Sequence, residues 1–126
     1  MDQHVVNSEK APQAIGPYSQ GIRAGEFLFV SGQLPVDPVS GMLVVGIEAQ
    51  TQQSIENIAA ILASEGLGLK SVIKTTVFLK DINDFQSMNS VYGKYFPLDA
   101  PARVCVQVAK LPKDALVEIE AVSFCR

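Results

Sequence analysis

Two segments near the C-terminal end of the chain alternate in polarity with a period of two residues. One face of residues 103–109 carries three valines, whereas the other face carries Arg103 and Cys105. Residues 116–124 likewise alternate apolar side chains with a second set that includes Glu118. Because successive side chains of a β-strand point to opposite faces, this pattern predicts two strands, each with one apolar face and one mixed face.

A turn at Lys110–Asp114 separates these segments and predicts that they form a hairpin. With residue 107 facing residue 118, the mixed face holds Arg103, Cys105, Glu118 and Glu120, and the valines pack beneath the helices. The backbones of Arg103 and Glu118 would then lie about 13 Å apart, a gap that a small ligand could fill. A monomer would expose this face, so we expect another copy of the chain to cover it and create a partly dry site, where charges interact more strongly.

The first half of the chain predicts three strands and a helix. Phe27–Ser31 is apolar on both alternating faces, which is typical of a strand covered on both sides. The turn-forming residues Asp37–Gly41 predict a link between two short strands. From about Glu48 to Glu65 the apolar spacing becomes helical, and Gly66 is a suitable residue to end the helix.

The second half adds a strand and a helix before the alternating segments. Val72–Lys80 is rich in β-branched residues and predicts a strand. A second helix is predicted from its apolar stripe, with a capping box formed by Asn83 and Gln86 at its start and Pro97 at its end. The order β-β-β-α-β-α-β-β indicates an α+β fold, with two helices on one face of a mixed sheet. At 126 residues, we expect a single domain over 1–126.

Composition excludes several classes of function. The chain has 10 Lys and Arg against 13 Asp and Glu, so no basic excess favours binding to nucleic acid. Its two cysteines lack the spacing of a zinc site, and its single histidine, His4, lies in a terminus expected to be frayed, so we expect no metal and no histidine-based catalysis. The sequence shows neither a signal peptide pattern nor a membrane-length apolar run, so we expect a reduced, cytoplasmic protein without membrane contact.

Five segments together resemble the RidA/YjgF/YER057c family. They cover nearly the whole chain in the family's order: Ala14–Gly21, Ser31–Pro35, Lys74–Phe78, Pro101–Val106 and Ala109–Ala121. The resemblance implies a chorismate-mutase-like α+β fold and a homotrimer with clefts between subunits. It also implies 2-iminobutanoate/2-iminopropanoate deaminase activity, which hydrolyses the enamines and imines released by pyridoxal-phosphate enzymes to 2-keto acids and ammonia. Neither a metal nor an organic cofactor is implied.

The resemblance also assigns roles to particular residues. Arg103 is expected to hold the substrate carboxylate through paired N–H donors, Glu118 to activate water, and Cys105 to line the pocket, which makes these three the candidate catalytic residues. The remaining substrate-binding candidates are Tyr18, Ser31, Gly32 and Asn89. Two positions depart from many relatives: Val104, whose side chain we expect in the core, and residues 96–100, which could reshape the pocket mouth.

Other interpretations of the same residues remain open. Without the resemblance, Arg103 would be read as a solvated residue at a strand start, Cys105 as a small buried apolar residue, Tyr18 as a loop anchor and Asn89 as solvent-facing. At the level of function, the alternatives are a non-catalytic trimer that binds small carboxylates such as 2-keto acids, and a weak chaperone or endoribonuclease-type activity.

Overall fold

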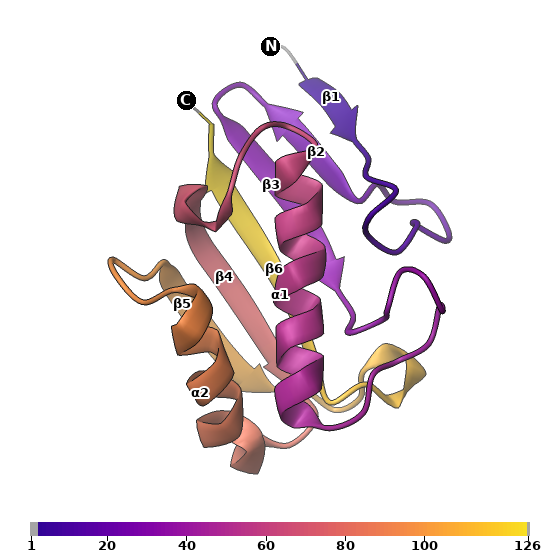
Figure 1. Ribbon diagram of the computed structural model, residues 1–126, viewed down its shortest axis with the longest axis vertical. Helices are drawn as coiled ribbons and strands as arrows, with labels where there is room; N and C mark the ends of the chain where they lie inside the picture. The colour runs from indigo at the N-terminus through magenta and orange to yellow at the C-terminus, as the bar shows by residue number, and fades with distance from the viewer. Residues whose placement is uncertain (1–2, 126) are drawn as a thin grey trace.

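The computed structural model describes residues 3–125, which form a six-stranded sheet and two long helices (Figure 1). The strands are β1 (Gln3–Val6), β2 (Gly21–Ala24), β3 (Phe27–Gln33), β4 (Val72–Leu79), β5 (Ala102–Gln107) and β6 (Val117–Phe124). The helices are α1 (Ile47–Ala63) and α2 (Phe85–Tyr95), with short 3-10 helices η1 (Leu69–Ser71), η2 (Ile82–Asp84) and η3 (Pro112–Asp114). None of these helices is long and apolar enough to cross a membrane.

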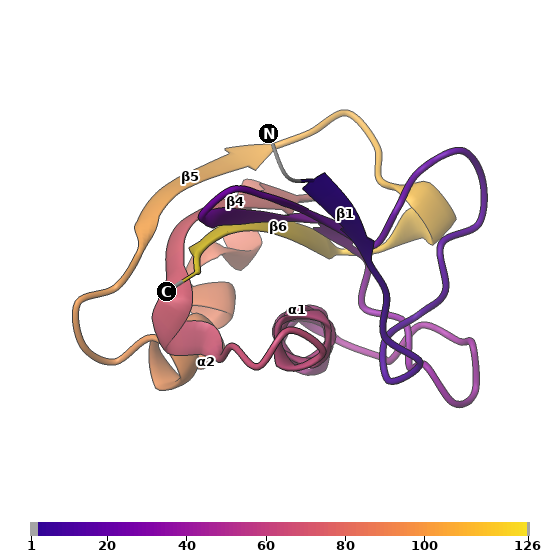
Figure 2. The same cartoon turned by 90° about the horizontal axis from the view of Figure 1, so that it is seen from above.

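The sheet is mixed and has the strand order β1-β2-β3-β6-β4-β5. Only β4 and β5 run parallel to each other; the other neighbouring pairs are antiparallel. Both helices cover the same face of the sheet, as the view from above shows (Figure 2). The predicted arrangement of two helices on one face of a mixed sheet is therefore confirmed.

The core lies between α1, α2 and the covered face of the sheet. Every third or fourth residue of α1 is buried there, including Ile55, Ile58 and Leu62, against Val77 of β4 and Ile119 of β6. Burying each such side chain is worth about 1.5–3 kcal/mol, so this apolar stripe holds the helix on the sheet. The sequence correctly predicted the helical stripe.

The turn that stops helix α1 contains Gly66, as the sequence predicted. This residue has a φ of 72°, in the left-handed region that glycine adopts without strain. Its N–H donates to the Ala63 carbonyl at 3.0 Å, and the Leu67 N–H donates to the Leu62 carbonyl at 3.0 Å. These two bonds form a Schellman turn, which satisfies carbonyls that the helix end would otherwise leave unpaired.

The N-terminal strands differ from the prediction. The predicted pair of short strands around Asp37–Gly41 is only an isolated bridge between Val36 and Leu43. The two further strands are instead β1 and β2, which pair with each other and join β3 through β2. The predicted order of elements is therefore right, although two of its first three strands lie elsewhere. Strands of four residues are too short to leave a clear periodic signal.

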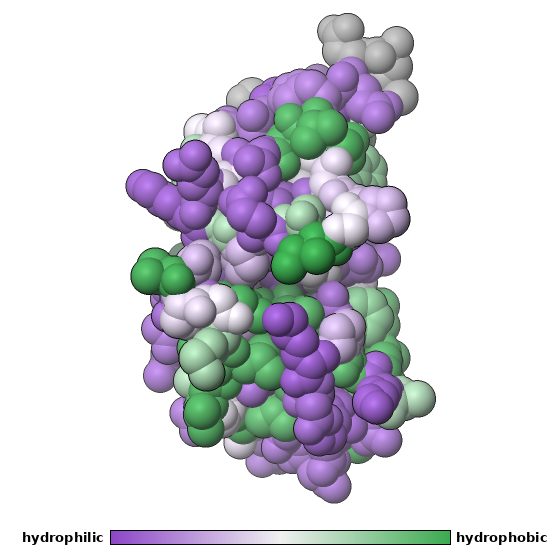
Figure 3. Space-filling model, turned by 90° about the vertical axis from the view of Figure 1, so that its right-hand side faces the viewer, coloured by the Kyte–Doolittle hydropathy of each residue, from purple (hydrophilic) through white to green (hydrophobic). Residues whose placement is uncertain are grey.

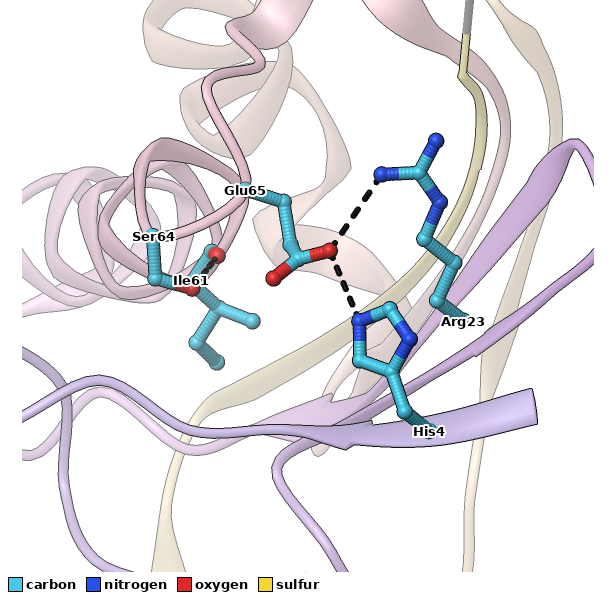
Figure 4. A network of polar contacts seen from close by, with 5 residues as sticks. All are labelled: His4, Arg23, Ile61, Ser64 and Glu65. Carbon is cyan, nitrogen blue, oxygen red and sulfur yellow. Dashed lines mark hydrogen bonds and ion pairs between the residues drawn. The ribbon is translucent and has the colours of Figure 1, made fainter. Parts of the chain in front are cut away.

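His4 has a structural role in this N-terminal region, where the sequence predicted an incidental residue. It lies in β1, and its Nε2 is 2.9 Å from Oε1 of Glu65, just beyond α1 (Figure 4). The same carboxylate oxygen accepts a hydrogen bond from Nη1 of Arg23 in β2 at 3.3 Å. Burial alone would raise the pKa of Glu65, but the hydrogen bonds and charges of His4 and Arg23 lower it below its ordinary value.

The predicted capping box at the second helix is wrong. Asp84 occupies the N-cap of α2 and makes no side-chain cap bond. Asp81 acts one turn earlier, where its carboxylate accepts a hydrogen bond from the Asn83 N–H at 2.9 Å and caps η2. The side-chain cap therefore belongs to the 3-10 helix η2 and not to α2, where the sequence predicted it.

The face of the sheet opposite the helices is open and partly apolar. In β3, Leu28 and Val30 are buried under the helices, but Phe27 and Phe29 are exposed, so the prediction of a strand covered on both sides fails within one chain. Further exposed apolar side chains on this face are Val5, Val104 and Val106. A group of exposed apolar side chains on one face is typical of a surface that binds another protein chain.

Candidate functional site

Strand β5 and strand β6 do not form the predicted hairpin, because β4 lies between them. Across β4, Gln107 is level with Leu79 and Val117, so residue 107 aligns with 117 instead of 118. A change of register by one residue exchanges the two faces of a strand. The predicted faces of β5 are therefore inverted: the valines lie on the open face, and Arg103 and Cys105 lie on the helix side.

Val104 shows this inversion directly. Its side chain is 45% exposed on the open face, although the sequence predicted a core position. Val106, at 40% exposed, follows it on the same face. Both are level with β6 glutamates across β4: Val104 with Glu120, and Val106 with Glu118. Val104, where this chain departs from many relatives, therefore lies on the open face of the sheet.

Arg103 lies between the edge of the sheet and α2, partly buried. Its Nη1 donates to Oδ1 of Asn89 on α2 at 2.7 Å. The guanidinium carbon also lies 4.8 Å from the centre of the Tyr92 ring and 5.5 Å from that of Phe85. Among residues 3–125, no carboxylate forms an ion pair with it. The structure thus holds a cation in a fixed place with donors to spare and no acidic partner.

Cys105 follows Arg103 on the same face and packs partly against the core. Burial raises the pKa of its thiol, and the positive charge of Arg103 offsets only part of that effect. A thiol with a raised pKa is neutral at neutral pH and is a poor nucleophile. The environment therefore favours the lining role for Cys105 over a covalent one.

Glu118 lies on the open face, at the base of a hollow of about 800 Å³. Burial, and next the nearby charge of Glu120, raise the pKa of the Glu118 carboxyl group above its ordinary value. The carboxylate rests directly over Gly32, because a Cβ built on that residue would overlap Oε2 of Glu118. A raised pKa in a hollow is a feature of carboxylates that transfer protons.

Gly32 reaches this position through a bulge in β3. The register with β6 shifts between Val30, which pairs with Ala121, and Gln33, which pairs with Ile119. Two residues of β3 therefore oppose the single residue between these partners on β6. Bulges of this kind re-aim the backbone and recur beside functional sites.

The loop after β1 closes one side of the hollow. Ser31 fixes this loop, because its Oγ donates to the Ser19 carbonyl at 2.6 Å and its N–H donates to the Gln20 carbonyl at 2.9 Å. Tyr18 lines the hollow and remains half-exposed. Figure 3 shows this side of the molecule, where apolar patches interrupt a largely polar surface. Tyr18, Ser31, Gly32 and Glu118 are thus brought together.

The predicted site residues therefore form two groups. Arg103, Asn89 and Cys105 lie on the helix side of the sheet, whereas Glu118 and its neighbours lie on the open side. Arg103 is level with Ala121, which is three residues from Glu118 and two strands from β5. The two backbones are thus about 14 Å apart and face opposite ways, so the predicted shared face is wrong and one chain does not bring both groups onto one small ligand.

Sequence reasoning missed Tyr92 and Phe85 as neighbours of Arg103. With Asn89 they lie at positions i, i+4 and i+7 of α2, which places them on one side of the helix. That spacing was visible in the sequence, but the inverted face of β5 concealed which strand residue they would meet. Among the described residues, no group of three or more His, Cys, Asp or Glu side chains could hold a metal ion.

The sequence and the fold agree with those of known proteins. Residues 8–125 match the family described as Endoribonuclease L-PSP. The chain belongs to this family, the same RidA/YjgF/YER057c family that its motifs indicate.

Particular relatives cover almost the whole chain. A RutC family protein of Pyrococcus horikoshii is 56% identical over 95% of this chain and 96% of its own length. The 2-iminobutanoate/2-iminopropanoate deaminase of Salmonella typhimurium is 47% identical over 96% of this chain and 97% of its own. The crystal structure of Escherichia coli TdcF with bound serine is similar with a TM-score of 0.94, at 43% identity, over 98% of this chain and 99% of that one.

Proposed function

We propose that this protein is a 2-iminobutanoate/2-iminopropanoate deaminase whose sites form between the subunits of a homotrimer. The observation that carries the proposal is Arg103, a partly buried cation held by Asn89 and two aromatic rings, with no acidic partner among residues 3–125. A buried cation without a partner is costly, so this arrangement favours binding of an anion. The 47% identical deaminase and the serine-bound neighbour support a small ligand that carries a carboxylate.

A second copy of the chain supplies what a single chain lacks. The open face of one copy carries Glu118 and exposed apolar side chains, and the edge formed by β5 and α2 carries Arg103. If this edge of one copy packs on the open face of the next, Arg103 and Glu118 approach one ligand from two subunits. An interface that joins different surfaces closes into a ring when the rotation permits, and we expect three copies in this ring, as the family resemblance implies.

The proposed chemistry needs only these groups and water. Arg103 binds the substrate carboxylate through two parallel N–H donors. Glu118 accepts a proton as water adds to the carbon of the protonated C=N group, and the resulting tetrahedral carbon carries both a hydroxyl and an amino group. Glu118 then returns that proton to the nitrogen. The hydroxyl oxygen loses its proton to water as it forms the C=O bond, and the C–N bond breaks to release ammonia and a 2-keto acid. Proton transfer of this kind contributes about 10²–10⁴-fold to a rate.

The test couples a threonine dehydratase to this protein and follows imine decay, together with the affinity for 2-ketobutyrate. Arg103→Ala should lose nearly all activity and bind 2-ketobutyrate at least about tenfold more weakly, because the carboxylate loses its charged partner. Arg103→Lys should lose much of the activity, because an ammonium offers a point charge in place of two parallel donors. Wild-type turnover by Arg103→Ala would contradict the proposal.

Glu118→Gln separates catalysis from binding alone. The glutamine preserves the shape of the side chain but cannot accept the proton, so we expect binding of 2-ketobutyrate with little hydrolysis. The second candidate function is a protein that binds 2-keto acids but hydrolyses nothing. In such a protein Glu118→Gln would leave the binding of 2-ketobutyrate unchanged, and there would be no imine hydrolysis to lose. Wild-type imine hydrolysis by Glu118→Gln would therefore contradict the catalytic role of Glu118.

A further inference from the structure

Tyr92 is a nearly fully buried side chain of α2 that is also fixed at its polar end. It is 5% exposed, and its hydroxyl is 2.6 Å from Oγ1 of Thr75 on β4. Burial raises the pKa of the hydroxyl, so it is neutral at physiological pH. The ring is therefore held at both ends: by the core around it and by one hydrogen bond to the sheet.

Thr75 is also the register partner of Arg103 on the neighbouring strand. The Tyr92 hydroxyl thus contacts the sheet beside the strand position from which the guanidinium extends. The guanidinium carbon lies 4.8 Å from the centre of the Tyr92 ring, closer than to the Phe85 ring at 5.5 Å. A cation at this distance from a ring is attracted by its π face.

We propose that Tyr92, fixed by Thr75, is a positioning residue that orients the guanidinium of Arg103 for a carboxylate. The proposal rests on the proposed function, in which Arg103 binds the substrate carboxylate. The single bond from Nη1 to Asn89 fixes one N–H but permits rotation about that contact. The ring supplies a second contact, so the side chain is ordered before the ligand arrives, and less conformational freedom is lost on binding.

The test varies the electrons of the ring and leaves its shape nearly unchanged. Tyr92→Phe serves as the reference, and phenylalanines with one, two and three ring fluorines replace it in turn at the same position. Fluorine withdraws charge from the π face, so the affinity for 2-ketobutyrate should fall stepwise, by about five- to tenfold across the series. In the imine assay KM should rise by the same factor while kcat stays within about twofold, because the contact acts on carboxylate binding.

Tyr95 provides a matched control on the same helix. Its hydroxyl donates to Oε2 of Glu56 at 2.7 Å, and its ring is not among those that contact Arg103 in the described residues. The same fluorinated series at position 95 should leave the affinity for 2-ketobutyrate unchanged. A role of Tyr92 in packing alone would give the same flat result at position 92, and that outcome would overturn the proposal.

Arg103→Gln in each background shows whether the ring acts through the arginine. With Arg103 replaced, the residual kcat/KM should no longer depend on fluorination at position 92. A trend that persists without Arg103 would overturn the positioning role. If Arg103→Gln abolishes turnover but fluorination has no effect, Tyr92 is not a positioning residue and the deaminase proposal stands. If Arg103→Gln turns over like the parent, the deaminase proposal fails, and the positioning proposal fails with it.

Discussion

Gly32 illustrates at the residue scale how backbone geometry sets the place of a catalytic candidate. The Glu118 carboxylate occupies the space where any other residue at position 32 would carry its Cβ. The side chain of Glu118 must therefore move when position 32 gains a side chain. Because Glu118 lines a hollow, it can move without unfolding the sheet.

The first prediction concerns Gly32→Ala. We expect this variant to lose imine hydrolysis by about tenfold or more, because a displacement of about 1 Å at a reacting group is costly. The melting temperature should change little. Gly68→Ala is the matched control, since a Cβ at Gly68 meets nothing within 4 Å. Full activity in the Gly32→Ala protein would contradict the placement of Glu118 described here.

The second prediction concerns the pH dependence of hydrolysis. Burial and Glu120 raise the pKa of Glu118, and a general base must be ionised to accept a proton. The value of kcat/KM should therefore rise with pH, with a midpoint above the ordinary glutamate pKa of 4.5. Glu120→Gln removes one cause of the raised pKa and should move the midpoint to lower pH. A midpoint in the parent protein at or below 4.5 would contradict the role of Glu118 as the titrating base.

At the scale of elements, the long periodic segments could be predicted from the sequence and the short ones could not. Helix α1, helix α2 and strand β4 follow from their apolar spacing. Strands β1 and β2 escape that reasoning because four residues hold too little pattern. The faces of β5 were predicted wrongly. The alternation of Arg103 and Cys105 with valines shows that the strand has two different faces, but it does not show which face the helices cover. That choice depends on the register with β4, the strand that lies between β5 and β6.

The site was predictable in a different way. Local spacing alone could not bring Tyr18, Gly32 and Glu118 together, since they come from three distant segments; the family motifs indicated them. The separation of Arg103 from Glu118 by the sheet depends on the strand order, which no local pattern contains. The contact between Arg103 and Asn89 required the same information.

The third prediction concerns the contact that joins strands β1 and β2 to the end of α1. Because the pKa of Glu65 is lowered on folding, its ionised form stabilises the folded state above the unfolded pKa, and this stabilisation is lost as pH falls through the lower folded value. Glu65→Gln should therefore lower the free energy of unfolding by about 0.2–1 kcal/mol at pH 7 and by less near pH 3. Urea denaturation at both pH values measures this.

The exposed Glu9 supplies the comparison for that experiment. Glu9 forms no ion pair among the described residues, so Glu9→Gln should leave the free energy of unfolding unchanged at either pH. An equal loss of stability by Glu65→Gln at pH 7 and pH 3 would show that the ionisation of Glu65 does not hold β1 and β2 to α1.

At the scale of the whole molecule, the proposed assembly depends on the open sheet face. Hydrophobic residues make up 48% of the chain and charged residues 18%, and part of that apolar surface lies exposed on this face. The fourth prediction is that Val106→Lys, which places a charge on the β5 side of this face, gives a 13.6 kDa monomer without hydrolase activity. Light scattering should give three times that mass for the parent protein.

Val39→Lys controls for the added charge. Val39 is 95% exposed in the loop before α1 and is not among the residues that line the hollow, so this variant should keep both the trimer and the activity. A parent protein that scatters only as a 13.6 kDa species would contradict the assembly, and so would a trimer that survives Val106→Lys with full activity.

The most direct test of the composite site mixes two inactive variants. Arg103→Ala and Glu118→Gln, unfolded together in equal amounts and refolded, should regain about one quarter of the wild-type rate, because one interface in four then pairs an intact Arg103 with an intact Glu118 from the neighbouring copy. Each variant refolded alone should remain inactive. A mixture that stays as inactive as its components, with mixed trimers shown by mass spectrometry, would contradict a site shared between subunits.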